Sequence, residues 1–270
     1  MNQKGQASKS EVKSLTTYWE RTHWPFQGLL FLLPLIVLYE LGALLYVREN
    51  GNTLPTLKAE LLLSKFFNLF GVTGYYLPGL ILVVVLFCWH LVRRDPWKPE
   101  FRLYVIMWVE SLVWTLPLLV FAAIVMREQQ GGSEAVAVLQ AAEAAGNGAS
   151  GGIPDLQAGL LLSVGAGIYE ELLFRLIGIA LLHTLLVDVL ALPPYVGAMG
   201  AVLGSSLAFA WVHPDAQALG MFAFYTVAGI YFAAVYLARG FGIVVATHAL
   251  YDVIAVSSPL VYNMLSPSQS

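Results

Sequence analysis

The sequence predicts an all-α fold, a polytopic bundle of transmembrane helices with about seven spans and bounds of six and eight. Of its 270 residues, 58% are hydrophobic and only 11% are charged, whereas about 25% of the residues in soluble domains are charged. The mean hydropathy is +0.71. A span needs about 20 apolar residues, so the apolar content suffices for this number of helices, and a water-soluble globule is excluded.

The N-terminal half divides into a polar segment, a group of transmembrane helices and a loop. Residues 1–25 are polar, and residues 26–126 contain three apolar runs long enough to span a membrane, at 26–46, 75–92 and 103–126. Near residues 59–70, leucine and phenylalanine are interrupted by lysine and asparagine, which predicts an interfacial helix. The Gly- and Ala-rich residues 127–155 are predicted to form an exposed loop.

Residues 156–265 are predicted to form the second group of helices. The apolar region 156–192 has 37 residues. As one helix it would be about 55 Å long, against a hydrocarbon core of about 30 Å. It is therefore either one span with an extension or two elements. Pro193 and Pro194 end it, since consecutive prolines cannot continue a helix. Further spans are predicted over 195–212, 218–238 and 243–265.

The charge distribution bears on partners and orientation. The net charge is -3 and the 14 basic residues are scattered, so the chain lacks the basic patch expected of a nucleic-acid-binding protein. The connection after the second span is rich in basic residues, namely Arg93, Arg94, Lys98 and Arg102. The positive-inside bias places this connection and the N-terminus in the cytoplasm. The loop at 127–155 then lies outside.

Ionisable side chains inside the apolar runs mark the candidate site, because such residues usually face a bundle interior or a water-filled cavity. Residues 168–175 read Ile-Tyr-Glu-Glu-Leu-Leu-Phe-Arg. Glu171 and Arg175 share a helix face at i,i+4 and can form an ion pair. Glu170 points about 100° away and stays available for proton transfer. The alternative is a buried ion-pair cluster that only holds helices together.

Two more apolar helices each contribute a histidine. His213 follows Phe209 at i,i+4, and Asp252 follows His248 at the same spacing. The aspartate can orient the imidazole and fix its tautomer, or the pair can simply link helices. One free carboxylate and two histidines supply the base, acid and oxyanion donors of peptide hydrolysis. The competing chemistry is a zinc site made by Glu170, His213 and His248.

The three motifs resemble those of a known family, the type II CAAX prenyl endopeptidases and their bacterial relatives, the CPBP intramembrane proteases. The family pattern is EExxxR, then FxxxH, then Hxxx(N/D), each in a separate transmembrane helix. This chain presents, in the same order, Glu170-Glu171-x-x-x-Arg175, Phe209-x-x-x-His213 and His248-x-x-x-Asp252. The resemblance covers residues 156–265, the expected catalytic core.

The resemblance implies a glutamate-dependent endopeptidase in which Glu170 and His213 activate the attacking water. His248 and Asp252 would line the oxyanion site, and the supporting residues would be Glu171, Arg175 and Phe209. No cofactor is expected, with zinc as the alternative because some relatives have been called metalloproteases. Family members often have Asn in place of Asp252. An ionised carboxylate donates no hydrogen bond, so Asp252 must be protonated or must orient His248.

The resemblance also implies a substrate and a location. The substrate would be a membrane protein or lipidated peptide, and the setting is the lipid bilayer of a bacterial cytoplasmic membrane. The alternative from another class is a non-enzymatic membrane protein. It would be a bacteriocin-immunity factor, a scaffold, or a proton-coupled transporter that uses Glu40, Glu110 and Glu170, because acidic residues in spans also mark proton relays.

Overall fold

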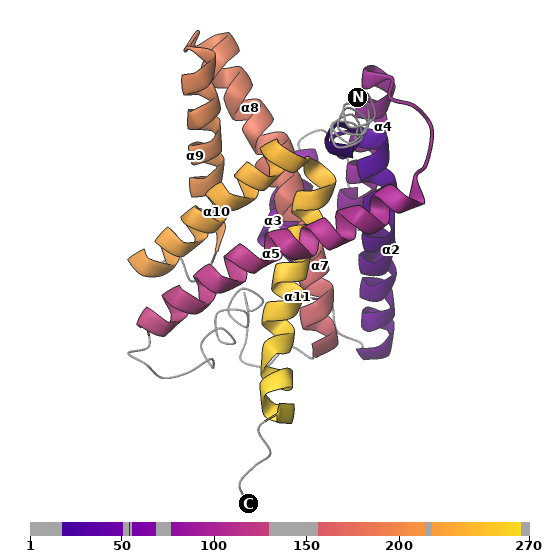
Figure 1. Cartoon of the computed structure of the whole chain (residues 1–270), viewed down its shortest axis with the longest axis vertical. Coiled ribbons are helices and arrows are strands. Elements are labelled where there is room, and N and C mark those ends of the chain that lie inside the picture. The colour runs from indigo at the N-terminus through magenta and orange to yellow at the C-terminus, as the bar shows by residue number, and fades with distance from the viewer. Residues whose placement is uncertain are drawn as a thin grey trace, which may run out of the picture.

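The computed structural model describes residues 18–50, 54, 56–68, 77–129, 156–213 and 218–265, and within these ranges every regular element is a helix (Figure 1). The N-terminal helices are α2 (Pro25–Asn50), α3 (Lys58–Asn68), α4 (Leu77–Arg93) and α5 (Phe101–Gln129). The C-terminal elements are α7 (Leu156–Glu170), η1 (Glu171–Ile179), α8 (Ala180–His183), η2 (Thr184–Val189), α9 (Pro194–Val212), α10 (Leu219–Arg239) and α11 (Phe241–Leu265). The predicted all-α class is confirmed.

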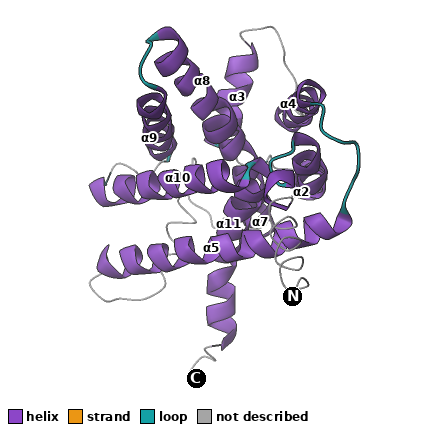
Figure 2. Ribbon diagram, turned by 45° about the horizontal axis from the view of Figure 1, so that its top comes forward, coloured by secondary structure: helices purple, strands orange, loops and turns teal. Residues whose placement is uncertain are grey.

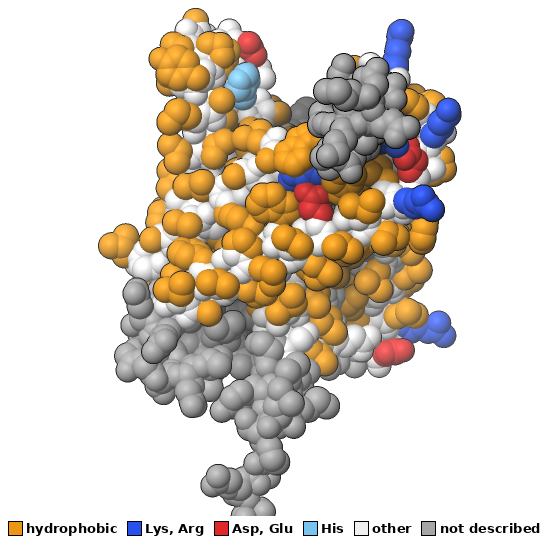
Figure 3. Space-filling view, viewed as in Figure 1, with side chains coloured by type: hydrophobic (Ala, Val, Ile, Leu, Met, Phe, Trp, Pro, Cys, Tyr) orange, Lys and Arg blue, Asp and Glu red, His pale blue; other side chains and the backbone are white. Residues whose placement is uncertain are grey.

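The apolar helices correspond to the predicted spans. Within the described ranges, five are long and apolar enough to cross a membrane by length and composition: Pro25–Glu49, Phe101–Val125, Leu156–Val189, Pro194–Val212 and Leu219–Arg239. Two shorter apolar helices, Gly79–Arg93 and Phe241–Ser257, complete the predicted set. Hydrophobic side chains cover most of the face seen in Figure 3, as expected of a surface that meets lipid.

The less regular parts of the prediction have mixed outcomes. Helix α3 matches the helix predicted near 59–70, while its place in the membrane interface stays a prediction. The predicted loop at 127–155 begins too early, because α5 continues to Gln129 as part of one unbroken helix. Residues 1–17 and 130–155 lie outside the described residues.

The long apolar region is one helical element. α7, η1, α8 and η2 follow one another without a break over the 34 residues Leu156–Val189, so the region is one helical element and not two. That this element is one span with an extension stays a prediction. Nine residues of η1 and six of η2 form π-helix. Pro194 then begins α9, because proline is favoured in the first turn of a helix.

Helix α9 brings the chain back to the middle of the long helix. It packs against η1, α8 and η2, and Figure 1 shows it running down alongside them. Nineteen positions separate Glu170 from Val189, and nineteen separate Pro194 from His213. The return therefore ends close to the level of Glu170. This return explains how the histidine at the end of one helix meets the carboxylate in the middle of another.

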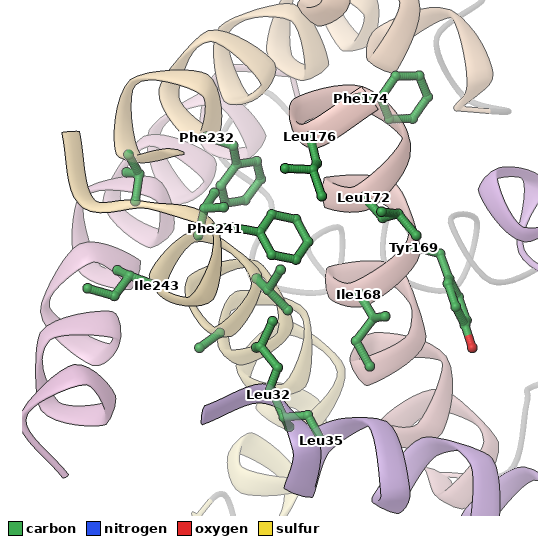
Figure 4. Close-up of a cluster of buried hydrophobic side chains, with 14 of the residues drawn as sticks. Leu32, Leu35, Ile168, Tyr169, Leu172, Phe174, Leu176, Phe232, Phe241 and Ile243 are labelled. Atoms are coloured by element: carbon green, nitrogen blue, oxygen red, sulfur yellow. The ribbon is translucent and has the colours of Figure 1, made fainter. Parts of the chain in front are cut away.

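The core lies where α11 crosses the bundle. Helices α5 and α10 run side by side in Figures 1 and 2, and α11 packs against both of them as well as against α2 and α7. The start of α11 is fully buried at Ile243, Val244, Val245 and Ala246. Figure 4 shows side chains of α2, α7, η1, α10 and α11 meeting there, among them Leu32, Ile168, Leu172, Phe232 and Ile243. This packing fixes α7, α10 and α11 relative to one another.

Close contact between α7 and α11 depends on Gly167. A Cβ at this position would lie 2.8 Å from the backbone nitrogen of Ala249, so Gly167→Ala is expected to destabilise the protein by about 1–3 kcal/mol through overpacking. Gly28→Ala is the matched control, because a Cβ there meets nothing within 4 Å. Alanine also favours helix. Denaturation midpoints in mixed detergent micelles measure both effects. Equal midpoints for the two variants would contradict this account of the α7–α11 contact.

Candidate active site

The three motif residues that the sequence singled out converge at the middle of the bundle. Glu170 ends α7, His213 follows α9, and His248 lies on α11. One carboxylate oxygen of Glu170, Oε2, is 3.8 Å from Nε2 of His213 and 3.9 Å from Nε2 of His248. The three side chains are 10%, 11% and 5% exposed. His213 and His248 therefore both direct their Nε2 atom toward the same buried oxygen of Glu170.

The adjacent carboxylate, Glu171, has the ion pair predicted for it. Its Oε2 lies 3.1 Å from Nε of Arg175, and both side chains are fully buried. Glu171 is also the first residue of η1, and Glu170 is the last of α7. Short π-helical segments inside α-helices are frequent at functional sites. The two neighbouring carboxylates thus have separate environments, as the sequence predicted.

Glu171 also holds His248, which the sequence did not indicate. Its Oε1 lies 2.7 Å from Nδ1 of His248. Because an ionised carboxylate only accepts hydrogen bonds, Nδ1 donates. Asp252, the partner expected to orient this imidazole, approaches the other nitrogen instead, with Oδ2 3.5 Å from Nε2. The group that fixes the ring at Nδ1 is therefore Glu171. No pattern within one helix could reveal this contact across 77 positions.

His213 has its tautomer set by its own helix. Its Nδ1 lies 2.7 Å from the backbone carbonyl oxygen of Phe209, and a carbonyl can only accept. Nδ1 therefore carries the proton, and in the neutral ring Nε2 presents a lone pair toward Glu170. The i,i+4 spacing of the FxxxH motif thus places the imidazole next to the backbone carbonyl of Phe209, in addition to any contact between the two rings.

Several buried polar atoms of the site make no hydrogen bond to a described residue, namely Oε2 of Glu170, Oε2 of Glu171, and Nε and Nη1 of Arg175. Glu171 Oε2 and Arg175 Nε pair with each other at 3.1 Å, whereas Glu170 Oε2 has only the two imidazoles, at 3.8 and 3.9 Å. A buried polar atom without a hydrogen bond is costly, so this oxygen makes Glu170 a candidate for the reacting group. Glu171, in contrast, is committed to Arg175 and His248.

Phe209 and Arg175 connect the motifs to one another. The guanidinium carbon of Arg175 lies 4.3 Å from the centroid of the Phe209 ring, within the range of a cation–π contact. The same ring is 4.6 Å from that of His213 and 6.0 Å from that of His248. All seven predicted site residues therefore lie in one cluster.

The nitrogen and oxygen atoms of the three side chains, Glu170, His213 and His248, stand slightly further apart than the ligands of a bound zinc ion. Among the described residues, no group of three or more His, Cys, Asp or Glu side chains has the spacing to hold a metal ion. Zinc bonds of about 2.0–2.2 Å in a tetrahedron place ligand atoms about 3.3–3.5 Å apart. The separations of 3.8 and 3.9 Å around Glu170 are wider. The chemistry below is therefore derived from the side chains alone, and zinc is left to a direct test.

Two other carboxylates in the apolar helices are engaged elsewhere. Glu110 of α5 pairs with Arg239 of α10 and accepts a hydrogen bond from Trp114 at 3.1 Å. Glu40 of α2 accepts a hydrogen bond from Tyr169 of α7 at 2.9 Å. Both therefore link helices. These contacts weaken the case for a proton relay that uses Glu40 and Glu110.

Comparison with known proteins agrees with the motifs. The family model described as Rce1-like type II CAAX prenyl endopeptidase matches residues 153–254, a range that contains all three motifs. Neither a curated protein nor a solved structure matches the chain. Together with the apolar helices, the match supports an integral membrane protein of the protease class. The resemblance to the type II CAAX prenyl endopeptidases is thereby confirmed over residues 153–254.

Proposed function

We propose that the protein is an intramembrane endopeptidase that hydrolyses a peptide bond in a membrane protein or lipidated peptide, with Glu170 as the general base. The observation that carries the proposal is the buried Oε2 of Glu170, which makes no hydrogen bond to a described residue and lies 3.8 and 3.9 Å from Nε2 of His213 and of His248. Activation of a water requires a base with an oxygen that can take its proton, and Glu170 offers one between two imidazoles. The match to a family model of membrane proteases supports the same reaction.

The first step is the attack of water. Atoms 3.8 Å apart can both lie within a hydrogen-bond distance of about 2.8 Å from one water oxygen. Glu170 Oε2 and His213 Nε2 would therefore accept the two protons of the same water. As the water oxygen bonds to the carbonyl carbon of the substrate, Glu170 takes one proton. The product of this step is a tetrahedral intermediate with a negative oxygen and a protonated Glu170.

The second step breaks the peptide bond. Glu170 returns its proton to the amide nitrogen, the carbon–nitrogen bond breaks, and an amine and a carboxylic acid leave. His248 would stabilise the oxyanion from Nε2. Carboxylates flank both of its ring nitrogens, Glu171 at 2.7 Å from Nδ1 and Asp252 at 3.5 Å from Nε2. A doubly protonated His248 then has an acceptor on each side, and Asp252 acts through this imidazole.

The setting of the reaction follows from the apolar helices and the charge pattern. Glu170, His213 and His248 lie on elements whose outer faces expose large hydrophobic side chains, which favours a substrate held in or on the bilayer. The basic connection between α4 and α5 supports a cytoplasmic N-terminus. We place the protein in a bacterial cytoplasmic membrane on the strength of the family resemblance.

A cleavage assay tests the proposal. Purified protein in nanodiscs is incubated with a farnesylated CAAX peptide and with the same peptide without its lipid, and products are identified by mass spectrometry. We expect cleavage by the native protein and its loss in His213→Ala. His183→Ala is the matched control, because His183 lies on α8 outside the cluster. Full activity in His213→Ala would overturn the assignment of Glu170 and His213.

The same assay separates the two chemistries. With water activated by the side chains alone, the rate is expected to stay unchanged after treatment with a zinc chelator such as 1,10-phenanthroline. A loss of activity that added Zn²⁺ restores would establish the zinc alternative with Glu170, His213 and His248 as ligands. Chelator added to a soluble glutamic peptidase controls for direct effects on the probe.

A further inference from the structure

Helix α10 carries no member of the three motifs, yet one of its faces lies against the site. Tyr225, Gly229 and Phe232 follow one another at i, i+4 and i+7, which places them on the same side of a helix. All three are buried. Tyr225 contacts His213, Gly229 contacts Arg175 and Phe232 contacts His248. Helix α10 therefore encloses the cluster together with the three helices that carry the motifs.

Each histidine of the site stacks on one aromatic ring of this face. The ring of His213 lies 4.0 Å from that of Tyr225 with an interplanar angle of 22°. The ring of His248 lies 4.4 Å from that of Phe232 with an angle of 19°. Both pairs are therefore close to parallel. The two aromatic residues are seven positions apart, so two turns of one helix set the separation of the two imidazoles.

Gly229 lets this face come close enough. A Cβ at this position would lie 3.0 Å from Cα of Ser206 in α9, so a larger side chain would push α10 away from the helix that carries His213. The carbonyl oxygen of Gly229 also accepts a hydrogen bond from Arg175 at 3.3 Å. The aromatic face is thus tied to the EExxxR motif as well as to α9.

We propose that Tyr225 and Phe232 are positioning residues, which hold the imidazoles of His213 and His248 so that both Nε2 atoms meet the same oxygen of Glu170. The proposal rests on the proposed function and adds to it residues from a helix outside the family motifs. Hydrogen bonds at Nδ1 anchor one point of each ring. A ring anchored at one point can still tilt, and the parallel aromatic neighbour removes that freedom.

His213 depends most on this support. It caps α9 with an extended backbone, at φ -77° and ψ 130°, and so lies beyond the regular helix. Phe209 contacts one side of its ring at an angle of 55°, and Tyr225 covers it nearly in parallel. The ring is held by its two aromatic neighbours and one hydrogen bond, whereas His248 lies within a regular helical segment.

Nuclear magnetic resonance of the full-length protein tests the packing directly. The chain has five histidines, so ¹³Cε1-labelled histidine gives a small set of signals that single histidine substitutions assign. Ring currents from the stacked aromatics are expected to shift the Hε1 signals of His213 and His248 upfield. Tyr225→Leu should remove the shift of His213, and Phe232→Leu that of His248. The conservative variants Tyr225→Phe and Phe232→Tyr should retain both.

Matched controls come from the neighbouring face of the same helix, where the ring of Phe224 lies 5.4 Å from that of Tyr225 and the ring of Tyr231 lies 6.1 Å from that of Phe232. Tyr231 donates a hydrogen bond to the carbonyl of Trp114, and Phe224 stacks on Phe121 with centroids 5.4 Å apart, so both pack against α5. Tyr231→Leu and Phe224→Leu should leave the two histidine signals in place. Equal shifts of these signals in the control and test variants would overturn the proposal, because the effect would then be a general loosening of α10.

The kinetic arm asks whether ring position matters for the reaction. With the farnesylated CAAX peptide as probe, Tyr225→Leu and Phe232→Leu should lower kcat by roughly 10- to 100-fold, as for other groups that orient catalytic ligands. KM should change much less, and Tyr225→Phe and Phe232→Tyr should restore kcat. Native kcat in a leucine variant whose histidine signal has moved would overturn the positioning role. Absence of cleavage by the native protein would count against the proposed function, while the signals still decide the packing.

Discussion

Glu170→Gln is expected to reduce peptide hydrolysis by roughly 10²- to 10⁴-fold, the range that general acid–base catalysis contributes. Glutamine keeps the shape of the side chain but cannot take the proton of the attacking water. Among the described residues, the ion-pair contacts of Glu170 are to the imidazoles of His213 and His248 and not to an arginine, so the substitution breaks no pair with a permanently charged group and the protein should stay folded. The measurement is kcat for the peptide probe, with circular dichroism to verify the fold.

Glu40→Gln is the matched control for this loss. Glu40 is also a carboxylate in an apolar helix, but it accepts a hydrogen bond from Tyr169 and links α2 to α7. The control variant should retain most of the activity. If Glu170→Gln instead rescues the phenotype of a deletion strain as well as the native protein does, the non-enzymatic alternative is favoured and the role of Glu170 as base is refuted.

The second large effect is on stability. Arg175→Met should destabilise the protein by about 3–5 kcal/mol, because it leaves the fully buried Glu171 without its cation. The double variant Glu171→Gln, Arg175→Met should regain much of this loss, since a buried pair can be replaced by neutral groups of similar volume at little cost. Unfolding in mixed detergent micelles gives the free energies, and a double-mutant cycle gives the coupling between the two residues.

Arg175→Lys refines this test. A lysine keeps the charge but loses the planar guanidinium that lies over Phe209 and donates to the carbonyl of Gly229. An intermediate loss of stability is expected. If the single methionine variant is as stable as the native protein, Glu171 is not charged in the fold, and the two separate environments of Glu170 and Glu171 must be reconsidered.

The helices were predictable because the apolar runs are long and their ends are marked. The double proline at 193 and 194 marks the start of α9, and Gly240 separates α10 from α11 at a φ of 89° that favours glycine. The pairing of Glu171 with Arg175 was predictable because both lie on one helix. Each of these signals is local, so a single sequence contains it.

The remaining features depend on contacts between distant helices. Glu171 approaches His248 only because α7 and α11 pack closely at Gly167. Tyr225 and Phe232 are ordinary residue types for an apolar helix, so nothing in their pattern separates a ring that stacks on a histidine from one that packs against α5. The sequence also did not predict that α9 ends beside Glu170, since this position depends on the uninterrupted length of the preceding helix.

The distance of Glu170 from the start of the same long helix sets a requirement for any substrate of the proposed enzyme. Glu170 lies 14 positions from the start of α7 at Leu156, a distance of about 21 Å at 1.5 Å per residue. An extended chain covers about 3.3–3.6 Å per residue, so a chain that enters from that end must supply about six unfolded residues before its scissile bond reaches the base. A protein without such a tail, however well it docks at the end of the bundle, would remain uncut.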